Sequence, residues 1–340
     1  MEKHMAENLQ NESDVAAINQ LRDTYTGIKS EMAKVIHGQN DVIEKMMICI
    51  LSRGHSLLMG VPGLAKTMMV HSLSELMSLK FSRIQFTPDL MPSDITGTDI
   101  LQETNQPGRR AFEFVKGPVF ANIVLADEIN RTPPKTQAAL LQAMQEHEVS
   151  VVGKTFRLEE PFFVLATQNP IEQEGTYPLP EAQLDRFMFF IKVKYPSKAE
   201  ELAIAKTTTG VMKSELKKVI NSEKILFFQD LVRRVPVPEH IYEYVVHLVR
   251  RTRPDSQESP EWLKPLVTWG AGPRAVQYLI LGAKARAVLQ GSYLVRQEDI
   301  ESVANEVLTH RILLSFHAET EGVTSEDIIK RLTSESEVNK

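Results

Sequence analysis

Short apolar runs recur along residues 56–193, and each is separated from the next by a turn-rich or helical stretch. Strands that alternate with helices favour a parallel sheet with both faces covered, because each parallel crossover places a helix against the sheet. We therefore predict an α/β fold for this part of the chain. The expected strands are Ser56–Met59, Phe81–Phe86, Ile123–Ala126, Phe162–Thr167 and Met188–Val193.

The pattern changes after Pro196, where strand signals fade and apolar residues recur at the spacing of amphipathic helices. We predict a second, smaller and all-helical domain over residues 196–335. Its expected helices are Ala199–Ala205, Ile225–Val232, Ile241–Val249, Ala275–Leu289 and Ile300–Leu308.

The N-terminal segment is polar. We expect a flexible extension over residues 1–25, and a short amphipathic helix at Ile28–Ile36. The α/β domain would then occupy residues 26–195.

Composition agrees with two globular domains, since the chain has 340 residues of which 42% are hydrophobic. The apolar runs are too short for a membrane span, and the N-terminus lacks the apolar core of a secretory signal. The single cysteine, Cys49, lies in an apolar stretch and is read as a buried thiol. We therefore expect a cytoplasmic protein. The net charge of -5 argues against a nucleic-acid partner.

A loop of small residues, Gly60–Thr67, follows the first expected strand and precedes a helical pattern. A strand that leads through such a loop into a helix presents backbone N–H groups to an anion, and the helix dipole adds positive potential. Lys66 would hold the β- and γ-phosphates of ATP, and the Thr67 hydroxyl would bind Mg²⁺. Ala65 stands where the strict motif has glycine. The expected nucleotide contacts here are Gly60, Pro62, Gly63, Leu64, Ala65, Lys66, Thr67 and Met68.

Two adjacent carboxylates, Asp127 and Glu128, end the apolar run Ile123–Ala126. Ligands of open α/β sheets bind at the carboxyl ends of the strands, so this pair is expected beside Gly60–Thr67, which we call the phosphate loop. Asp127 would hold Mg²⁺, and Glu128 would polarise the attacking water. An isolated Asp-Glu pair is more often an exposed charge pair, but its place after this strand favours an ATPase.

Taken together, these motifs resemble the MoxR family of AAA+ ATPases, in the helix-2-insert group. The similarity extends over about residues 27–310 and is carried by Gly60–Thr67, Gly117–Phe120, Leu125–Leu141, Ala166–Pro170 and Leu179–Phe187. The resemblance implies a P-loop NTPase sheet, the AAA+ core, with a helical lid domain. It also implies a homo-oligomer, expected to be a hexamer, and a protein client, with von Willebrand factor A domain proteins as the candidate class.

The resemblance assigns roles that spacing alone does not. Asn169 is similar to the sensor-1 residue, although an Asn-Pro turn is the plainer interpretation. Arg186 is similar to the arginine finger that completes a neighbouring subunit's site, with a salt bridge to Asp185 or Glu181 as the alternative. Arg274 is similar to sensor 2, whose action on its own or a neighbour's nucleotide stays open. The segment that borders adenine in the family corresponds to Val35, Ile36, Gly38 and Gln39.

Two hairpins are expected beside the site. Residues 94–118 form two short strands around the turn Gln106–Arg109 and resemble the helix-2 insertion, and Val149–Leu158 alternates about a Gly-Lys turn.

The leading functional hypothesis is Mg²⁺-dependent ATP hydrolysis by an oligomer that remodels or matures a protein partner. The alternatives are a motor stimulated by nucleic acid and a chelatase-like regulatory subunit that binds nucleotide but hydrolyses it poorly.

Overall fold

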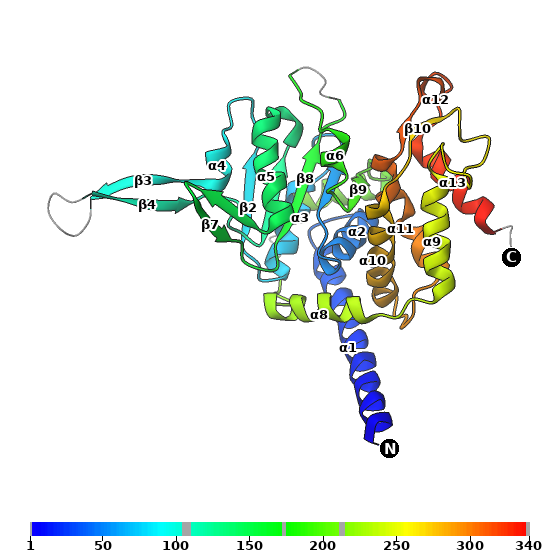
Figure 1. Ribbon diagram of the computed structural model, residues 1–340. Helices are drawn as coiled ribbons and strands as arrows, with labels where there is room; N and C mark the ends of the chain where they lie inside the picture. Colours follow the sequence, from blue (N-terminus) through cyan, green and yellow to red (C-terminus); the bar gives the residue numbers. More distant parts are fainter. Residues whose placement is uncertain (1, 104–109, 172–174, 211–214, 338–340) are drawn as a thin grey trace.

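The computed structural model describes residues 2–103, 110–171, 175–210 and 215–337. A five-stranded parallel sheet lies at its centre, in the order β2-β5-β8-β1-β9, with helices on both faces (Figure 1). All the expected strands are present, and the α/β prediction is confirmed. The strands of this sheet are β1 (Ser56–Met59), β2 (Phe81–Gln85), β5 (Ile123–Asp127), β8 (Phe163–Gln168) and β9 (Phe189–Lys192).

The side chains of successive residues in a strand point to opposite faces of the sheet. Leu58 of β1 belongs to the apolar cluster that includes α2 (Asn40–Leu51) and α3 (Lys66–Leu76). Leu57 belongs to a second cluster, together with residues of α5 (Pro134–Glu146). A strand buried on both sides needs apolar residues nearly throughout, which is why the inner strands β1, β5 and β8 read as apolar runs. The edge strand β2 has one buried residue and is mostly polar.

The C-terminal part of the chain is mainly helical, and the expected helices are all present. Its apolar residues join the cluster of α2 and α3, so the two parts share a continuous core. The prediction of a domain without strands is corrected, because β10 (Val267–Trp269) pairs antiparallel with β11 (Leu313–Leu314). Strands this short do not show the alternation of apolar and polar residues that predicts a strand from sequence. The helices are α7 (Lys198–Thr208), α8 (Ser222–Arg234), α9 (Glu239–Arg251), α10 (Pro273–Leu289), α11 (Gln297–Leu308), α12 (Phe316–Thr320) and α13 (Ser325–Glu337), with the 3₁₀ turn η2 (Thr309–Arg311).

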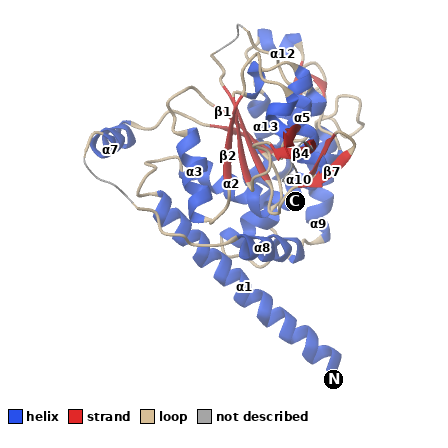
Figure 2. Ribbon diagram, turned by 90° about the vertical axis from the view of Figure 1, so that its left-hand side faces the viewer, coloured by secondary structure: helices blue, strands red, loops and turns tan. Residues whose placement is uncertain are grey.

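The N-terminal segment forms one long helix, α1 (Glu2–Met32), which extends beyond the body of the molecule (Figure 2). The segment expected to be a flexible extension lies within this helix, and the helix expected at Ile28–Ile36 ends instead at Met32. From Ala17 to Met32 the helix carries buried apolar residues at a heptad-like spacing, and α1 contacts α3, α8 and α10. The buried residues are Ala17, Ile18, Leu21, Tyr25, Ile28 and Met32.

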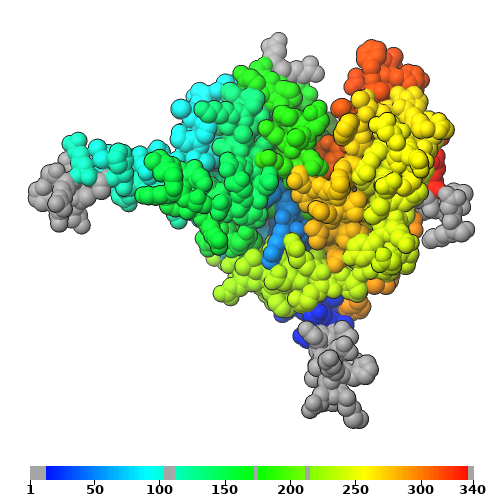
Figure 3. Space-filling view, in the orientation of Figure 1, coloured from blue at the N-terminus to red at the C-terminus, as the bar shows by residue number. Residues whose placement is uncertain are grey.

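Both expected hairpins are present. In the first, β3 (Gly97–Glu103) pairs with β4 (Arg110–Lys116) after the short helix α4 (Pro92–Thr96); the expected turn at Gln106–Arg109 lies outside the described residues. This hairpin stands away from the body of the molecule (Figure 3). In the second, β6 (Glu148–Val151) pairs with β7 (Lys154–Arg157).

No helix among the described residues combines the length and the apolar character that a bilayer crossing requires.

Candidate functional site

The loop between β1 and α3 bends through two left-handed residues. Gly63 has a φ of +85° and Ala65 a φ of 55°. Glycine adopts such angles freely, whereas an L-residue does so at a cost of about 1 kcal/mol. The helix begins at Lys66, and the N–H groups of a first helical turn have no acceptors within the helix. The loop can therefore bind an anion.

A hollow of about 350 Å³, which we call the loop hollow, lies beside this bend. It brings together the phosphate loop, the acidic pair and Asn169, as the sequence predicted. Gly60 lies just outside it at the end of β1, where its carbonyl accepts a hydrogen bond from Lys66 Nζ. The lining residues are Pro62, Gly63, Leu64, Ala65, Lys66, Thr67, Met68, Asp127, Glu128, Thr167 and Asn169.

Lys66 is half-buried, and burial lowers the pKa of its ammonium group, while Asp127 and Glu128 act in the opposite direction. Its Nζ also lies 3.4 Å from the Val61 carbonyl oxygen. An anion in the loop hollow would give this ammonium a charged partner in place of neutral carbonyls.

The acidic pair is held at the end of β5 by Thr167. The threonine hydroxyl donates to Asp127 Oδ1 at 2.6 Å and accepts the Glu128 N–H at 2.9 Å. Glu128 has a φ of 58°, an unusual conformation for a residue with a side chain. Strain of this kind often occurs at functional sites. The Thr67 hydroxyl and the Asp127 carboxylate line the same hollow, and hard oxygen donors of this type suit Mg²⁺.

Sequence reasoning missed two residues of β2 that contact the acidic pair. Arg83 donates to Asp127 Oδ2 at 2.6 Å, and Gln85 Nε2 donates to Glu128 Oε2 at 2.9 Å. Arg83 and Gln85 lie on the same face of the sheet because they are two positions apart on one strand. They reach the acidic pair because this strand pairs directly with β5. This alternation is visible in the sequence, but the order of the strands is not. Metal binding at Asp127 would have to displace Arg83 or share the carboxylate with it.

Asn169 follows β8 and is 7% exposed. Its Oδ1 accepts the Ile171 N–H at 3.1 Å. Asn169 therefore forms a local turn, which is the alternative to a sensor role. The residue nevertheless lines the loop hollow, and its amide group offers a hydrogen-bond donor as well as an acceptor.

The segment expected to border adenine lies apart from the loop hollow. Val35 lines an adjoining hollow of about 880 Å³, which shares Met68 with the first one. Gln39 donates from Nε2 to the Lys194 carbonyl at 2.8 Å. Ile36 is buried in the core, and Gly38 adopts a left-handed φ of +74°.

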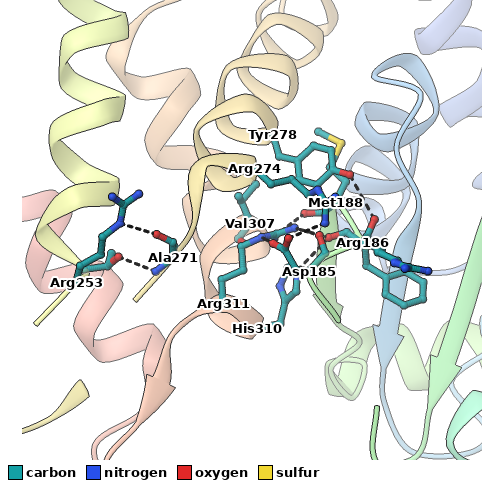
Figure 4. Close-up of polar contacts among 12 residues, drawn as sticks. Asp185, Arg186, Met188, Arg253, Ala271, Arg274, Tyr278, Val307, His310 and Arg311 are labelled. Carbon is teal, nitrogen blue, oxygen red and sulfur yellow. Dashed lines mark hydrogen bonds and ion pairs between the residues drawn. The ribbon is translucent and has the colours of Figure 1, made fainter. Parts of the chain in front are cut away.

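The two predicted arginines also lie outside the lining of the loop hollow. Arg274 forms an ion pair of 2.7 Å with Asp185, and the other carboxylate oxygen of Asp185 accepts from Arg311 at 2.8 Å (Figure 4). Arg186 directly follows Asp185, which comes after α6 (Glu181–Leu184), and its side chain points away from this cluster. Because Asp185 is occupied by other arginines, the salt bridge considered as an alternative role for Arg186 does not form with this residue.

Comparison with known proteins identifies both parts of the chain. The family model for the ATPase family associated with various cellular activities (AAA) matches residues 55–189, and that for the AAA lid domain matches residues 261–332. A candidate ATPase from Cytophaga hutchinsonii, solved by crystallography, superposes with a TM-score of 0.87 at 41% identity; the match covers 96% of this chain and 97% of that one.

Among curated proteins, the chaperone MoxR1 of Mycobacterium tuberculosis is 44% identical over 302 residues, covering 89% of this chain and 79% of that protein. The uncharacterized protein YeaC of Bacillus subtilis is 44% identical over 302 residues, covering 88% and 90%. The protein MoxR of Methylorubrum extorquens is 30% identical over 310 residues, covering 88% and 90%.

Proposed function

Because this chain belongs to the MoxR family of AAA+ ATPases, we propose that it hydrolyses ATP with Mg²⁺ in the loop hollow and that a second copy completes the site. The observation that carries the proposal is the meeting of the phosphate loop, Lys66 and the acidic pair in one hollow at the end of the sheet.

The phosphates of ATP would lie against the first turn of α3, with Lys66 at the β- and γ-phosphates. Thr67 and Asp127 would hold Mg²⁺, which when bound neutralises phosphate charge. Glu128 would orient the attacking water and accept its proton, and Asn169 would help to place that water. The base would lie toward Val35 in the adjoining hollow.

A finger supplied by a second copy is supported by the position of Arg186. It does not line the loop hollow of its own chain, and among the described residues its guanidinium has no ion pair that would hold it back. An arginine that reaches a neighbouring site neutralises charge as the phosphoryl group is transferred. Arg274 lies beside the same segment, so we infer that it too serves the neighbour's nucleotide.

The assembly would be a hexameric ring in the cytoplasm that acts as a chaperone on protein partners, with von Willebrand factor A domain proteins as the candidate class. A protein partner is supported by the apolar side chains that the hairpins expose. Leu101 is 52% exposed, Phe112 70% and Val152 77%. Apolar side chains of this kind suit a protein surface better than a phosphate backbone.

The test is phosphate release by the purified chain, measured per subunit across a range of protein concentrations with Mg²⁺ or with EDTA. We expect hydrolysis that requires Mg²⁺ and whose rate per subunit rises with concentration until assembly is complete. A Mg²⁺-dependent rate that does not change with concentration would contradict the shared site, and an absence of hydrolysis in assembled protein would contradict the ATPase itself.

A further inference from the structure

The Asp185–Met188 segment joins α6 to β9, and each of its four backbone carbonyls accepts a hydrogen bond from a side chain of the C-terminal part. Arg311 donates to the carbonyls of Asp185, Phe187 and Met188, and the Tyr278 hydroxyl donates to that of Arg186 at 3.3 Å (Figure 4). The backbone from which Arg186 projects is therefore held from the helical domain.

Arg311 provides most of these contacts. Its side chain is 2% exposed, and its Nε donates to the Asp185 carboxylate at 2.8 Å. One terminal nitrogen donates to the Asp185 carbonyl at 2.8 Å and to the Phe187 carbonyl at 2.7 Å. A guanidinium holds its donors in a rigid plane, so several acceptors are fixed relative to one another. The ammonium group of a lysine cannot span the same acceptors.

Asp185 links this buried contact to the outer arginine. One carboxylate oxygen binds Arg311 and the other binds Arg274, whose side chain is 39% exposed. The exposed partner can exchange Asp185 for another anion at lower cost than the buried one, because it is already hydrated. Arg311 is thus the permanent part of the contact.

We propose that Arg311 is a positioning residue that sets the direction of Arg186, so that the position of the helical domain determines whether a subunit can complete its neighbour's site. This inference rests on the proposed function, because Arg186 has that task only if a second copy shares the site. A shift of the helical domain relative to the sheet would carry the four carbonyls, and with them Arg186, away from the neighbouring nucleotide.

The first test substitutes Arg311→Lys and measures kcat together with the affinity for a fluorescent ATP analogue. We expect kcat to fall by about 10-fold or more with unchanged affinity, since a misplacement of about 1 Å can cost about 10²-fold in rate. Arg251→Lys is the matched control, because Arg251 is also buried in the helical domain but binds Leu332 and Glu335 instead. An unchanged kcat in folded Arg311→Lys would overturn the proposal.

The second test mixes subunits. A Glu128→Gln subunit has a disabled site but an intact Arg186, whereas an Arg311→Lys subunit has an intact site and a displaced Arg186. A random 1:1 mixture should recover about a quarter of the parental rate, the share of interfaces that join the two intact halves. A merely structural role for Arg311 would give no recovery, because the defect would stay with the variant's own site.

The mixture of Arg186→Ala with Glu128→Gln separates the two proposals. Failure of this mixture to recover activity contradicts the shared site itself. Recovery here, without recovery for Arg311→Lys, contradicts only the positioning role.

Tyr278→Phe keeps the test decisive if Arg311→Lys does not fold, as judged by the loss of a cooperative thermal transition. It removes only the hydrogen bond to the Arg186 carbonyl. We expect a lower kcat, unchanged nucleotide affinity and recovery in the mixture with Glu128→Gln. Tyr293→Phe, which removes a hydroxyl contact to Asn19, is the control and should behave as the parent. If Arg311→Lys does not fold, a parental kcat in Tyr278→Phe would overturn the proposal.

Discussion

The loop hollow and the Asp185–Met188 segment are both needed for the proposed reaction, but they are held in place differently. The hollow is built from residues at one edge of the sheet, and the phosphate loop passes directly from β1 into α3. The segment depends on Arg311, which is 126 residues away from Asp185 in the chain. In the proposed reaction, binding of ATP would therefore depend on the sheet, whereas completion of the reaction would depend on how the two parts of the chain are packed.

The largest expected effect separates these two properties directly. Arg186→Ala should lower kcat by about 10³-fold, because it removes the charge that stabilises phosphoryl transfer. Nucleotide affinity should stay unchanged, since Arg186 does not line the loop hollow. Phosphate release at saturating ATP and titration with a fluorescent analogue measure the two quantities. Arg233→Ala, at an exposed position of α8, is the control. A weaker affinity in Arg186→Ala would place this arginine at its own subunit's nucleotide.

Glu128→Gln tests the loop hollow through the same two quantities, kcat and nucleotide binding. The amide keeps the shape of the side chain but cannot accept the proton of water, so kcat should fall by about 10²-fold or more while ATP stays bound. Retention of ATP after gel filtration and single-turnover hydrolysis measure the effect. Glu146→Gln, an exposed residue of α5, provides the control. Hydrolysis at the parental rate would remove Glu128 from its catalytic role.

The contact between the domains should also respond to pH through His310, whose Nε2 lies 3.0 Å from the Phe187 carbonyl oxygen. Burial, and then the charge of Arg311, holds the pKa of His310 well below its usual 6.5. Well above pH 6.5 the histidine is neutral whether the chain is folded or unfolded. Below it the unfolded chain takes up a proton that the folded chain does not, so the free energy of unfolding falls.

For one such histidine, the loss between pH 8 and pH 5.5 is on the order of 1 kcal/mol. His310→Gln should therefore lose about that much less than the parent over this range, as measured by urea unfolding at both pH values. His240→Gln, at an exposed position of α9, should lose as much as the parent. Identical pH dependence in the parent and in His310→Gln would show that His310 is not held neutral in the folded chain.

The smallest expected effect concerns Ala65. Its left-handed φ of 55° suits glycine, so Ala65→Gly should raise the free energy of unfolding by about 0.5–1 kcal/mol, after the greater freedom of glycine in the unfolded chain is subtracted. Urea unfolding measures this, and Ala203→Gly inside α7 should be destabilising instead. A less stable Ala65→Gly would mean that the methyl group makes compensating contacts.

Local patterns predicted most of the fold and the loop hollow. Most of the sheet strands are mainly apolar runs, although β2 is not, and the residues expected to bind phosphate and metal follow two of these runs directly. The contacts of Arg83 and Gln85 depend on which strands are neighbours, and that order results from packing of the whole domain. Arg311 gave no local signal, because an arginine at the end of a helix is usually exposed. The long helix α1 was missed because most of its residues are polar, and between Ser13 and Met32 a single stripe of residues is buried.

The contact between Asp185 and Arg311 has a consequence for the evolution of the chain and for protein engineering. The sheet and the helical domain are not freely interchangeable modules, since a chimera that combines them from two relatives would join an arginine and a carboxylate that have not evolved together. Such a chimera should fold and bind ATP but hydrolyse it slowly. Substitutions at positions 185 and 311 are accordingly expected to occur together among related sequences.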